Sequence, residues 1–298
     1  MNLSITIFNV LFPIMLIAAI GYWYAKRSSN AYMQFINNAN MDIFAPALIF
    51  SALTQSSWSL QENIALMAGA FSIVLGVGLL TLPLCKILNI DRRVLLPPTM
   101  FNNSANLGVP LLVFSFGADI LPQAILLYVC SSILHFSLGL AIVNPSANIL
   151  KQLTRPALVA AFLAILFNVM QWRLPLALDR SIDLMGQIAI PLMIFALGTK
   201  LTDIPKFNFR TPILAGAWIP LSGLLVAILY IYLVPVSDSQ KNLLLIFSLL
   251  PPAVFNFLVA ERYLENEEMK GQVAELVLWG NVLCIVPIAM MLAWIFSR

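Results

Sequence analysis

Ten apolar segments of membrane-spanning length, joined by short polar connections, constrain the fold of this chain more than any other feature. The segments are expected near residues 5–25, 41–57, 63–84, 94–116, 121–143, 154–172, 181–199, 211–234, 242–263 and 272–296. A bilayer core about 30 Å thick needs about 20 apolar residues, and a helix satisfies its backbone hydrogen bonds within such a segment. Since the segments take up most of the 298 residues, we predict an all-α integral membrane protein with ten transmembrane helices and no soluble domain.

Composition excludes several classes of function. Only 10% of the residues are charged, the three cysteines are isolated in or beside apolar segments, and the single histidine belongs to no HExxH sequence. We therefore expect no metal site, no cofactor and no disulfide framework. The net charge of +3 comes mostly from loops that would face anionic lipid, so the expected partner is the bilayer and not a nucleic acid.

The basic residues predict how the chain is oriented in the membrane. Twelve of the 16 Lys and Arg residues fall in the odd-numbered connections, among them Lys151 with Arg155, and the group of Lys200, Lys206 and Arg210. By the positive-inside rule these connections are cytoplasmic. We expect a multi-pass protein of the plasma (inner) membrane with both termini outside.

An internal repeat relates the second and seventh segments. A stretch that begins at Asp42 matches one that begins at Gln187, at an offset of 145. Five segments separate the two copies, so residues 1–145 and 150–298 would form two five-helix halves of opposite orientation. Such inverted repeats are typical of secondary transporters, whose sites lie on discontinuous helices between the halves.

Four residues of this repeat are candidates for a structural or functional role. Pro46 and Pro191 hold equivalent places, where each would bend its helix and shape a groove in the scaffold. Asp42 and Gln187 are expected to cap helix ends, with a place in a vestibule as the alternative.

Polar residues interrupt the fourth segment where a membrane helix should be apolar. Within nine positions the chain places Asn102, Asn103, Ser104, Asn106, Gly108 and Pro110. Non-helical backbone at membrane depth requires bonding partners from protein or from a water-filled cavity, and this cluster lies about 15 Å from the membrane boundary, near the midplane. We predict a helix broken at Gly108 and Pro110 and a substrate site beside it. The alternative is a kinked helix whose asparagines bond across a packed interface.

The ninth segment carries a matching interruption, a proline pair that ends at Pro252, followed by Asn256. An offset of 146 places Asn256 opposite Pro110, whereas an offset of 154 aligns the pattern LLPPxxFN in the two segments. We prefer 146, because it is close to the register of the second segment. Each broken helix would point an N-terminus, with free N–H groups and partial positive charge, at the membrane centre, which suits a carboxylate.

His135 lies in the middle of the fifth segment, and an offset of 146 places Asn281 opposite it. Imidazole exchanges a proton near physiological pH, so these two residues are candidates for proton coupling. A neutral histidine bonded to a helix backbone is the alternative that we favour for a single residue. Sodium coupling also stays open, since unwound carbonyls and Asn or Ser oxygens bind Na⁺.

The string NSANLGVP at residues 103–110, together with PPAVFNFLVAERY at residues 251–263, resembles the auxin efflux carrier family, including bacterial permeases for malonate, malate and similar acids. The resemblance covers the whole chain. It implies a fold like that of the bile acid:sodium symporters, in which the fourth and ninth helices unwind and cross. It also implies that Asn103 and Pro110 belong to the first crossing, whereas plant members carry a proline at the position of Asn256.

The resemblance implies a mechanism as well. Helices one, two, six and seven would form a scaffold, and helices three to five and eight to ten a transport unit that moves against it in elevator-type alternating access. We therefore expect a secondary transporter, not an enzyme, for a small organic anion: a carboxylate such as malate or malonate, or an auxin-like aromatic acid. The scaffold helices would also be the place for a homodimer contact. A sodium-coupled symporter is the main alternative, and an intramembrane enzyme a weaker one, because no nucleophile–base pair or metal cluster is found.

Overall fold

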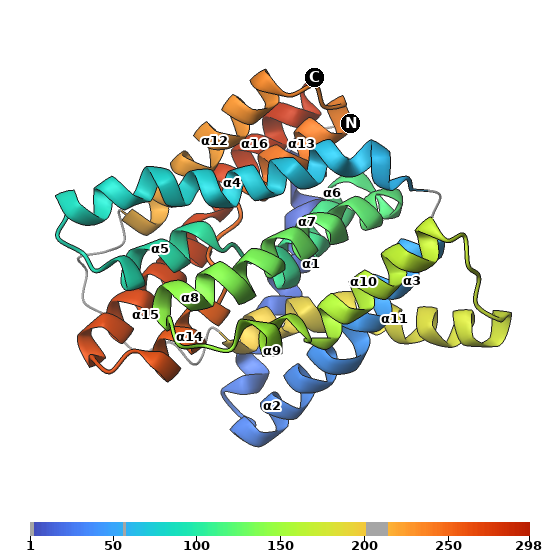
Figure 1. The fold of residues 1–298 in the computed structure, drawn as a ribbon, viewed down its shortest axis with the longest axis horizontal. Helices are drawn as coiled ribbons and strands as arrows, with labels where there is room; N and C mark the ends of the chain where they lie inside the picture. The colour runs from blue at the N-terminus through green and yellow to red at the C-terminus, as the bar shows by residue number, and fades with distance from the viewer. Residues whose placement is uncertain (1–2, 56–57, 201–213) are drawn as a thin grey trace.

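The computed structural model describes residues 3–55, 58–200 and 214–298. Over these ranges the chain forms helices and one isolated antiparallel bridge, with no β-strand (Figure 1). Lys206 and Arg210, which entered the orientation prediction, lie outside the described residues.

The first half of the chain runs through nine α-helices and four single turns of other helix types. In chain order they are α1 (Leu3–Ala25), α2 (Asn30–Ala39), the π turn η1 (Asn40–Phe44), α3 (Ala45–Gln55), α4 (Leu60–Ile87), α5 (Arg92–Met100), the π turn η2 (Ser104–Gly108), α6 (Val109–Phe116), the 3₁₀ turn η3 (Ala118–Ile120), α7 (Leu121–Leu134), the π turn η4 (His135–Gly139), α8 (Leu140–Val143) and α9 (Ile149–Leu153).

The second half has longer helices with fewer interruptions. Among the described residues they are α10 (Pro156–Val169), α11 (Leu176–Lys200), the π turn η5 (Leu214–Trp218), α12 (Ile219–Leu233), α13 (Asp238–Ser248), α14 (Phe255–Tyr263), α15 (Glu267–Leu283) and α16 (Ile285–Phe296). Both termini lie at the same end of the molecule (Figure 1).

Six continuous helical stretches of the described chain are long and apolar enough to cross a membrane. They are Leu3–Ala25, Leu60–Ile87, Ala118–Val143, Leu176–Thr199, Gly216–Leu233 and Glu267–Phe296. Two shorter apolar helices, Ser104–Phe116 and Pro156–Val169, accompany them. The predicted all-helical membrane protein is therefore confirmed, whereas the number of ten spans stays a prediction, because it counts short and interrupted helices as spans.

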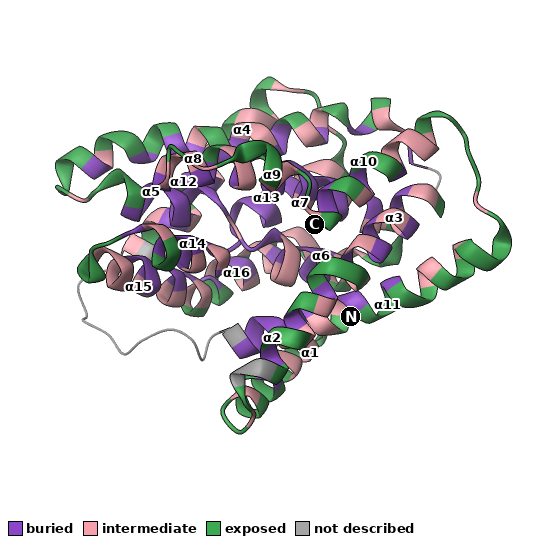
Figure 2. Ribbon diagram, turned by 60° about the horizontal axis from the view of Figure 1, so that its bottom comes forward, coloured by how far each residue is buried: buried purple, intermediate pink, exposed green. Residues whose placement is uncertain are grey.

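The buried residues form two separate hydrophobic clusters. The smaller one joins α3, α10 and α11 to one face of α7, with Ile49, Leu53, Ala161 and Met193 among its members. The larger one fills the space among α4, α5, α6 and α12 to α16 and takes in part of α1. Helices α7 and α13 are mostly buried at the centre (Figure 2). The helices around α3 and α11 thus pack as a unit of their own, which α7 connects to the rest.

Helices α1 and α11 approach each other until their backbones touch. A Cβ at Gly198 would lie 1.8 Å from Ala18 O, and a Cβ at Gly21 would lie 2.2 Å from Phe195 O. Small residues allow such close backbone contact between membrane helices, where dispersion forces and interhelical bonds replace hydrophobic driving force. These two glycines therefore fix the spacing of the pair.

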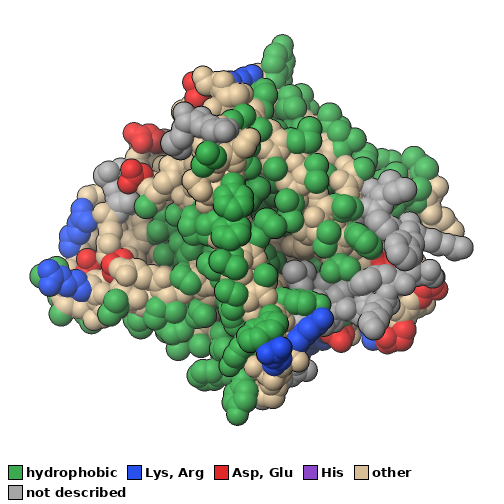
Figure 3. Space-filling view, turned by 180° about the vertical axis from the view of Figure 1, so that it is seen from behind, with side chains coloured by type: hydrophobic (Ala, Val, Ile, Leu, Met, Phe, Trp, Pro, Cys, Tyr) green, Lys and Arg blue, Asp and Glu red, His purple; other side chains and the backbone are tan. Residues whose placement is uncertain are grey.

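The outer surface is apolar, as a lipid environment requires. Large hydrophobic side chains stand exposed along α1, including Phe8 and Trp23. On the face opposite to that of Figure 1, hydrophobic side chains cover the middle, and Lys, Arg, Asp and Glu lie toward its edges (Figure 3). Hydrocarbon can therefore cover the middle of this face without burying charged side chains.

The structure corrects the predicted roles of Asp42 and Gln187. Asp42 lies in η1, within the continuous helical stretch from α2 to α3, and Gln187 lies inside α11, where its side-chain amide donates to Asp183 (2.9 Å). Neither residue caps a helix end. The hydropathy pattern predicts both helix starts too late in the chain, because the first turns of these helices are polar.

Candidate functional site

Two interrupted helices lie side by side at the centre of the molecule. Helix α5 ends at Met100, the chain is non-helical at residues 101–103, and the next helix begins at Ser104. Helix α13 ends at Ser248, and α14 begins at Phe255 after a stretch that contains Pro251 and Pro252. The first break therefore lies before Gly108 and Pro110, and the prediction that these two residues form it is wrong. Pro110 lies within the continuous helical stretch Ser104–Phe116, where the π turn η2 passes into α6.

The two breaks bond to each other through their backbones. Asn102 and Pro252 form the isolated antiparallel bridge. Two hydrogen bonds flank it, from Asn103 N to Pro251 O (2.7 Å) and from Ala253 N to Phe101 O (2.9 Å). Backbone groups that leave a helix inside a membrane need such partners, because no water is present to replace them.

Three asparagine side chains bond further carbonyls of the breaks. The Nδ2 atoms donate from Asn102 to Phe247 O, from Asn256 to both Phe101 O and Ala253 O, and from Asn281 to Pro252 O, each at 2.9 Å. The amides of Asn256 and Asn281 thus hold the second break in place.

The bridge between the breaks relates residues that are 150 positions apart. The bridge pairs Asn102 with Pro252, and each of these two receives a bond from a residue 29 positions further along the chain, Ser131 (3.4 Å to Asn102 Oδ1) and Asn281. A two-fold axis through the bridge would therefore pair Ser131 with Asn281. The predicted offsets of 146 and 154 both differ from this register, and His135 is not the counterpart of Asn281 in it.

A cavity of about 520 Å³ opens beside the first break. Its wall combines residues of α2, η1, the first break, η2, α7, η4, the α9–α10 connection, α11 and α14. The polar and charged members are Asn37, Asn40, Asp42, Asn102, Asn103, Ser104, Asn106, Tyr128, Ser131, Ser132, His135, Lys151, Gln152, Thr154 and Arg155. Such a volume suits a small molecule, and the amide-rich wall distinguishes the cavity from the apolar core.

Three of the π turns meet at this cavity. Asn40, Ser104 and His135, the first residues of η1, η2 and η4, all line it. A single π turn widens a helix locally and frequently marks a functional position. Each turn here redirects side chains of an otherwise regular helix toward the cavity.

Two buried asparagines of the cavity wall have polar atoms without partners. Asn103 is 4% exposed and its Nδ2 has no hydrogen-bond partner, and the same holds for Oδ1 of Asn40, at 3% exposure. An unmade hydrogen bond of a buried group costs about 1–3 kcal/mol, so native structures rarely leave one open. Both residues line the cavity, and each keeps an unused hydrogen-bonding atom there.

The helix that starts at Ser104 presents its N-terminus to the same space. Ser104, Ala105 and Asn106 line the cavity, and the first helical bonds are those of Leu107 N and Gly108 N to Asn103 O (3.2 and 2.9 Å). The N–H groups before them have no partner within the helix. Together with the helix dipole they favour an anion.

Arg155 supplies a full positive charge at the cavity wall. Its guanidinium lies over the rings of Phe136 (4.4 Å) and Phe255 (5.1 Å) and donates two hydrogen bonds to Gln152 Oε1 (3.2 and 3.0 Å). Lys151 adds a second cation to the wall. In the sequence, Lys151 and Arg155 were evidence only for the orientation of the chain in the membrane. The signal that could have found Arg155 is its place directly before Pro156, at the start of an apolar helix.

His135 is enclosed by aromatic rings. It is 8% exposed, stacks on Phe101 (4.5 Å between centroids, 5° between planes) and meets Phe255 edge-on (5.3 Å). His135 therefore lies against the first break as well as at the cavity.

The structure divides the predicted site residues into two groups. Asn102, Asn103, Asn106 and His135 line the cavity. The other predicted residues support the breaks or lie elsewhere: Asn256 and Asn281 bond the breaks, Pro252 packs on Gly280, Gly108 packs on Leu250, Pro110 is buried, and Pro46 and Pro191 lie in α3 and α11 outside the cavity wall. In the described chain no group of His, Cys, Asp and Glu could hold a metal ion.

A helical membrane protein with two interrupted helices bonded at its centre and a polar cavity beside them has the architecture of a membrane transporter. The family model of membrane transport proteins matches residues 6–148 and 142–292. The chain belongs to this family, that of the auxin efflux carrier permeases, and the resemblance noted from residues 103–110 and 251–263 is confirmed. No curated protein matches the chain closely enough to assign a substrate.

Proposed function

We propose that this transporter is a secondary carrier that moves a small organic anion by alternating access, with the substrate bound in the cavity beside the first break. One observation carries the proposal: Asn103, whose buried Nδ2 has no partner, lines a cavity beside a helix N-terminus, and Arg155 and Lys151 belong to the same wall. A carboxylate requires hydrogen-bond donors and positive charge. The Asn103 amide, the helix N-terminus and the two basic side chains supply them.

The proposal divides these groups between two ends of the substrate. One carboxylate binds the Asn103 amide and the N–H groups at the start of η2. The remainder of the anion extends toward Arg155, where a second carboxylate would meet the guanidinium and an aromatic acid would meet the rings of Phe136 and Phe255. Malate, malonate and auxin-like acids are therefore all retained as candidates.

The transport step that we propose is of the elevator type, within two inverted halves of five helices each (residues 1–145 and 150–298). Helices α1, α2–α3, α10 and α11 would form the scaffold and the other helices the moving unit. The packing of α3, α10 and α11 in one hydrophobic cluster supports this grouping, and α1 joins them through its close backbone contact with α11. Arg155, at the start of α10, would then contact Phe136 and Phe255 across the boundary of the two units.

Uptake by the purified protein in liposomes tests this function. Radiolabelled malate, malonate and indole-3-acetate are offered, each with a proton gradient, a sodium gradient or neither. Saturable uptake of at least one acid, with the acid recovered unchanged inside, is the expected result. Uptake that requires the sodium gradient would select the symporter alternative, and conversion of the acid would select an enzyme. Absence of uptake of any organic acid would contradict the proposal.

Arg155→Gln is expected to weaken binding of the transported acid about ten-fold. A hydrogen bond to a charged group contributes about 1.5–3 kcal/mol, and the lower end applies because the guanidinium is only half-buried. Competition uptake measures the change. Arg262→Gln is the matched control, since Arg262 also lies over a ring, that of Tyr263 (5.4 Å), but does not line the cavity. Equal losses of affinity in the two variants would show that Arg155 is not part of the binding site.

His135 allows a direct test of proton coupling. Because its ring is stacked on Phe101 and enclosed by Phe255, we expect His135→Gln to reduce stability while the pH dependence of uptake persists. Uptake at several external pH values, normalised to the amount of folded protein, checks this. A loss of pH dependence with exchange of substrate intact would assign the coupling proton to His135.

We also propose that the protein lies in the plasma (inner) membrane with both termini outside. The distribution of Lys and Arg supports this orientation, and so does the position of both termini at one end of the molecule. A C-terminal reporter that is active only in the cytoplasm is expected to stay silent, whereas the same reporter inserted after Asn144 is expected to be active. Activity at the C-terminus would overturn the orientation.

The exposed apolar side chains of α1 are consistent with a homodimer through the scaffold helices. We retain it as part of the proposal. Gel filtration with light scattering in detergent measures the mass.

A further inference from the structure

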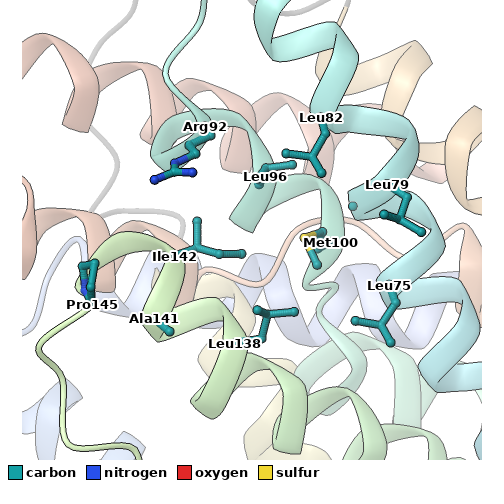
Figure 4. Close-up of a pocket in the computed structure, with 11 residues that line it drawn as sticks. Leu75, Leu79, Leu82, Arg92, Leu96, Met100, Leu138, Ala141, Ile142 and Pro145 are labelled. Carbon is teal, nitrogen blue, oxygen red and sulfur yellow. The ribbon is translucent and has the colours of Figure 1, made fainter.

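A second cavity, of about 590 Å³, lies between α4, α5 and α8, apart from the site described above (Figure 4). Leu75, Leu79 and Leu82 of α4 form one side and are exposed on the outer surface of the molecule. Leu96 and Met100 of α5 are buried and form the floor. The cavity is therefore an apolar groove that opens sideways to the bilayer, and bilayer components reach it most directly.

One charged side chain, Arg92, stands at the end of this groove. Figure 4 shows its guanidinium at the opposite end of the cavity from Leu75, near Ile142 and Pro145. Its neighbour Arg93 is already paired, because Nη2 and Nε contact both carboxylate oxygens of Asp91 (2.9 and 3.1 Å at the closest). Among the described residues no ion pair is formed by Arg92. An unpaired cation at the mouth of an apolar groove is complementary to an anionic head with a hydrocarbon tail.

We propose that this groove binds an anionic phospholipid, with its phosphate at Arg92 and one acyl chain between α4 and α8. α5 rises about 12 Å from Arg92 to Met100, so the groove can hold the part of an acyl chain next to the headgroup. A soluble anion would meet Arg92 but leave the apolar groove empty. A zwitterionic lipid such as phosphatidylcholine would bring a choline cation near Arg92 along with its phosphate, so its net electrostatic attraction to Arg92 is weaker.

Bound there, the lipid holds the end of α5 against α4. Met100 is the last residue of α5 and packs on Gly78 of α4, where a Cβ would lie 2.7 Å from the Met100 sulfur. The non-helical residues 101–103 follow directly. The lipid thus stabilises the helix that leads into the first break. This inference is independent of the proposed substrate, because it concerns a different cavity and a binding assay without transport.

Native mass spectrometry of the purified protein in detergent tests the proposal, with dioleoyl phosphatidylglycerol and dioleoyl phosphatidylcholine added separately. The parent protein is expected to retain phosphatidylglycerol in preference to phosphatidylcholine. Arg92→Gln is expected to weaken phosphatidylglycerol binding about five-fold, the effect of one basic residue near anionic lipid. Lys86→Gln is the matched control, because Lys86 lies in the last turn of α4, close to Arg92 in the chain, and does not line the groove. Glycerol 3-phosphate, a headgroup without chains, is expected not to compete.

The acyl chain is tested by filling the groove and by labelling it. Ala141→Trp is expected to reduce binding of both lipids, with folding checked by gel filtration. In the parent protein, a phosphatidylglycerol with a diazirine on its acyl chain is expected to label peptides of α4 and α8. This labelling locates the acyl chain even if Ala141→Trp does not fold. Equal losses in Arg92→Gln and Lys86→Gln, equal retention of the two lipids, or labelling confined to other helices would each overturn the proposal.

Discussion

Asn103→Asp is expected to bind an anionic substrate more weakly than Asn103→Ala, which itself loses about 5- to 150-fold in affinity. The Ala variant deletes an amide whose Nδ2 is buried without a protein partner, on a residue that lines the cavity. The substrate loses a hydrogen bond worth about 1–3 kcal/mol in a buried setting. The Asp variant keeps the shape and removes the donor. It also adds a negative charge beside the helix N-terminus that would receive the carboxylate, so like charges repel in a site of low dielectric.

Binding by purified protein measures this difference, by thermal shift or with a labelled acid identified by the uptake screen. Ser115→Ala is the matched control, because Ser115 lies at the far end of the same span and its hydroxyl bonds only to Leu111 O (2.7 Å). Gel filtration checks that each variant is folded. A folded Asn103→Asp that binds the acid as tightly as the parent protein would show that the anion does not bind at the first break.

Gly198→Ala is expected to lower the free energy of unfolding by about 1–3 kcal/mol, the usual cost of overpacking a close contact. The added Cβ would lie 1.8 Å from Ala18 O and 2.9 Å from Tyr22 N, both backbone atoms of α1. Backbone atoms cannot rotate away as a side chain can, so α1 and α11 must separate along their length. By the usual scaling of large domains, the melting temperature is expected to fall by about 2–12 °C.

Thermal unfolding of the detergent-solubilised protein, followed by intrinsic fluorescence, checks this result. Gly271→Ala is the matched control, because Gly271 is also helical but a Cβ there would meet no atom within 4 Å. The same substitution at Gly271 is expected to leave the melting temperature unchanged or raise it, by up to about 1 kcal/mol of stability. Similar melting temperatures in both variants would mean that α1 and α11 do not pack as closely as described.

Much of the fold could be predicted because the membrane reduces the alternatives. A chain with apolar segments of this length can satisfy its backbone only as helices, so hydropathy alone indicated an all-helical membrane protein. The interruption at residues 102–110 was visible for the same reason, since asparagines and a proline contradict a uniform lipid-facing helix. The class of protein and its family therefore followed from local patterns and from the resemblance at residues 103–110 and 251–263.

The details of the breaks could not be predicted in this way. Glycine and proline suggested a break at Gly108 and Pro110, yet the chain leaves the helix at residues 101–103. Pro110 lies inside the continuous stretch Ser104–Phe116, where the π turn η2 passes into α6, so it does not mark where α5 ends. The position of the break depends on carbonyl and N–H partners of the second break, 150 residues away in the chain.

The sequence by itself determined that the chain is a helical membrane protein, where its apolar helices lie and which stretch carries polar residues at membrane depth. Hydropathy and proline act within a few neighbouring residues, so a one-dimensional pattern reports them. Only the tertiary structure decided that Asn256 and Asn281 bond the breaks, that the Nδ2 of Asn103 has no partner, and that Arg155 joins the cavity from the other half of the chain. These roles depend on which donors and acceptors meet after folding, and no local preference of an asparagine or arginine specifies its distant partner.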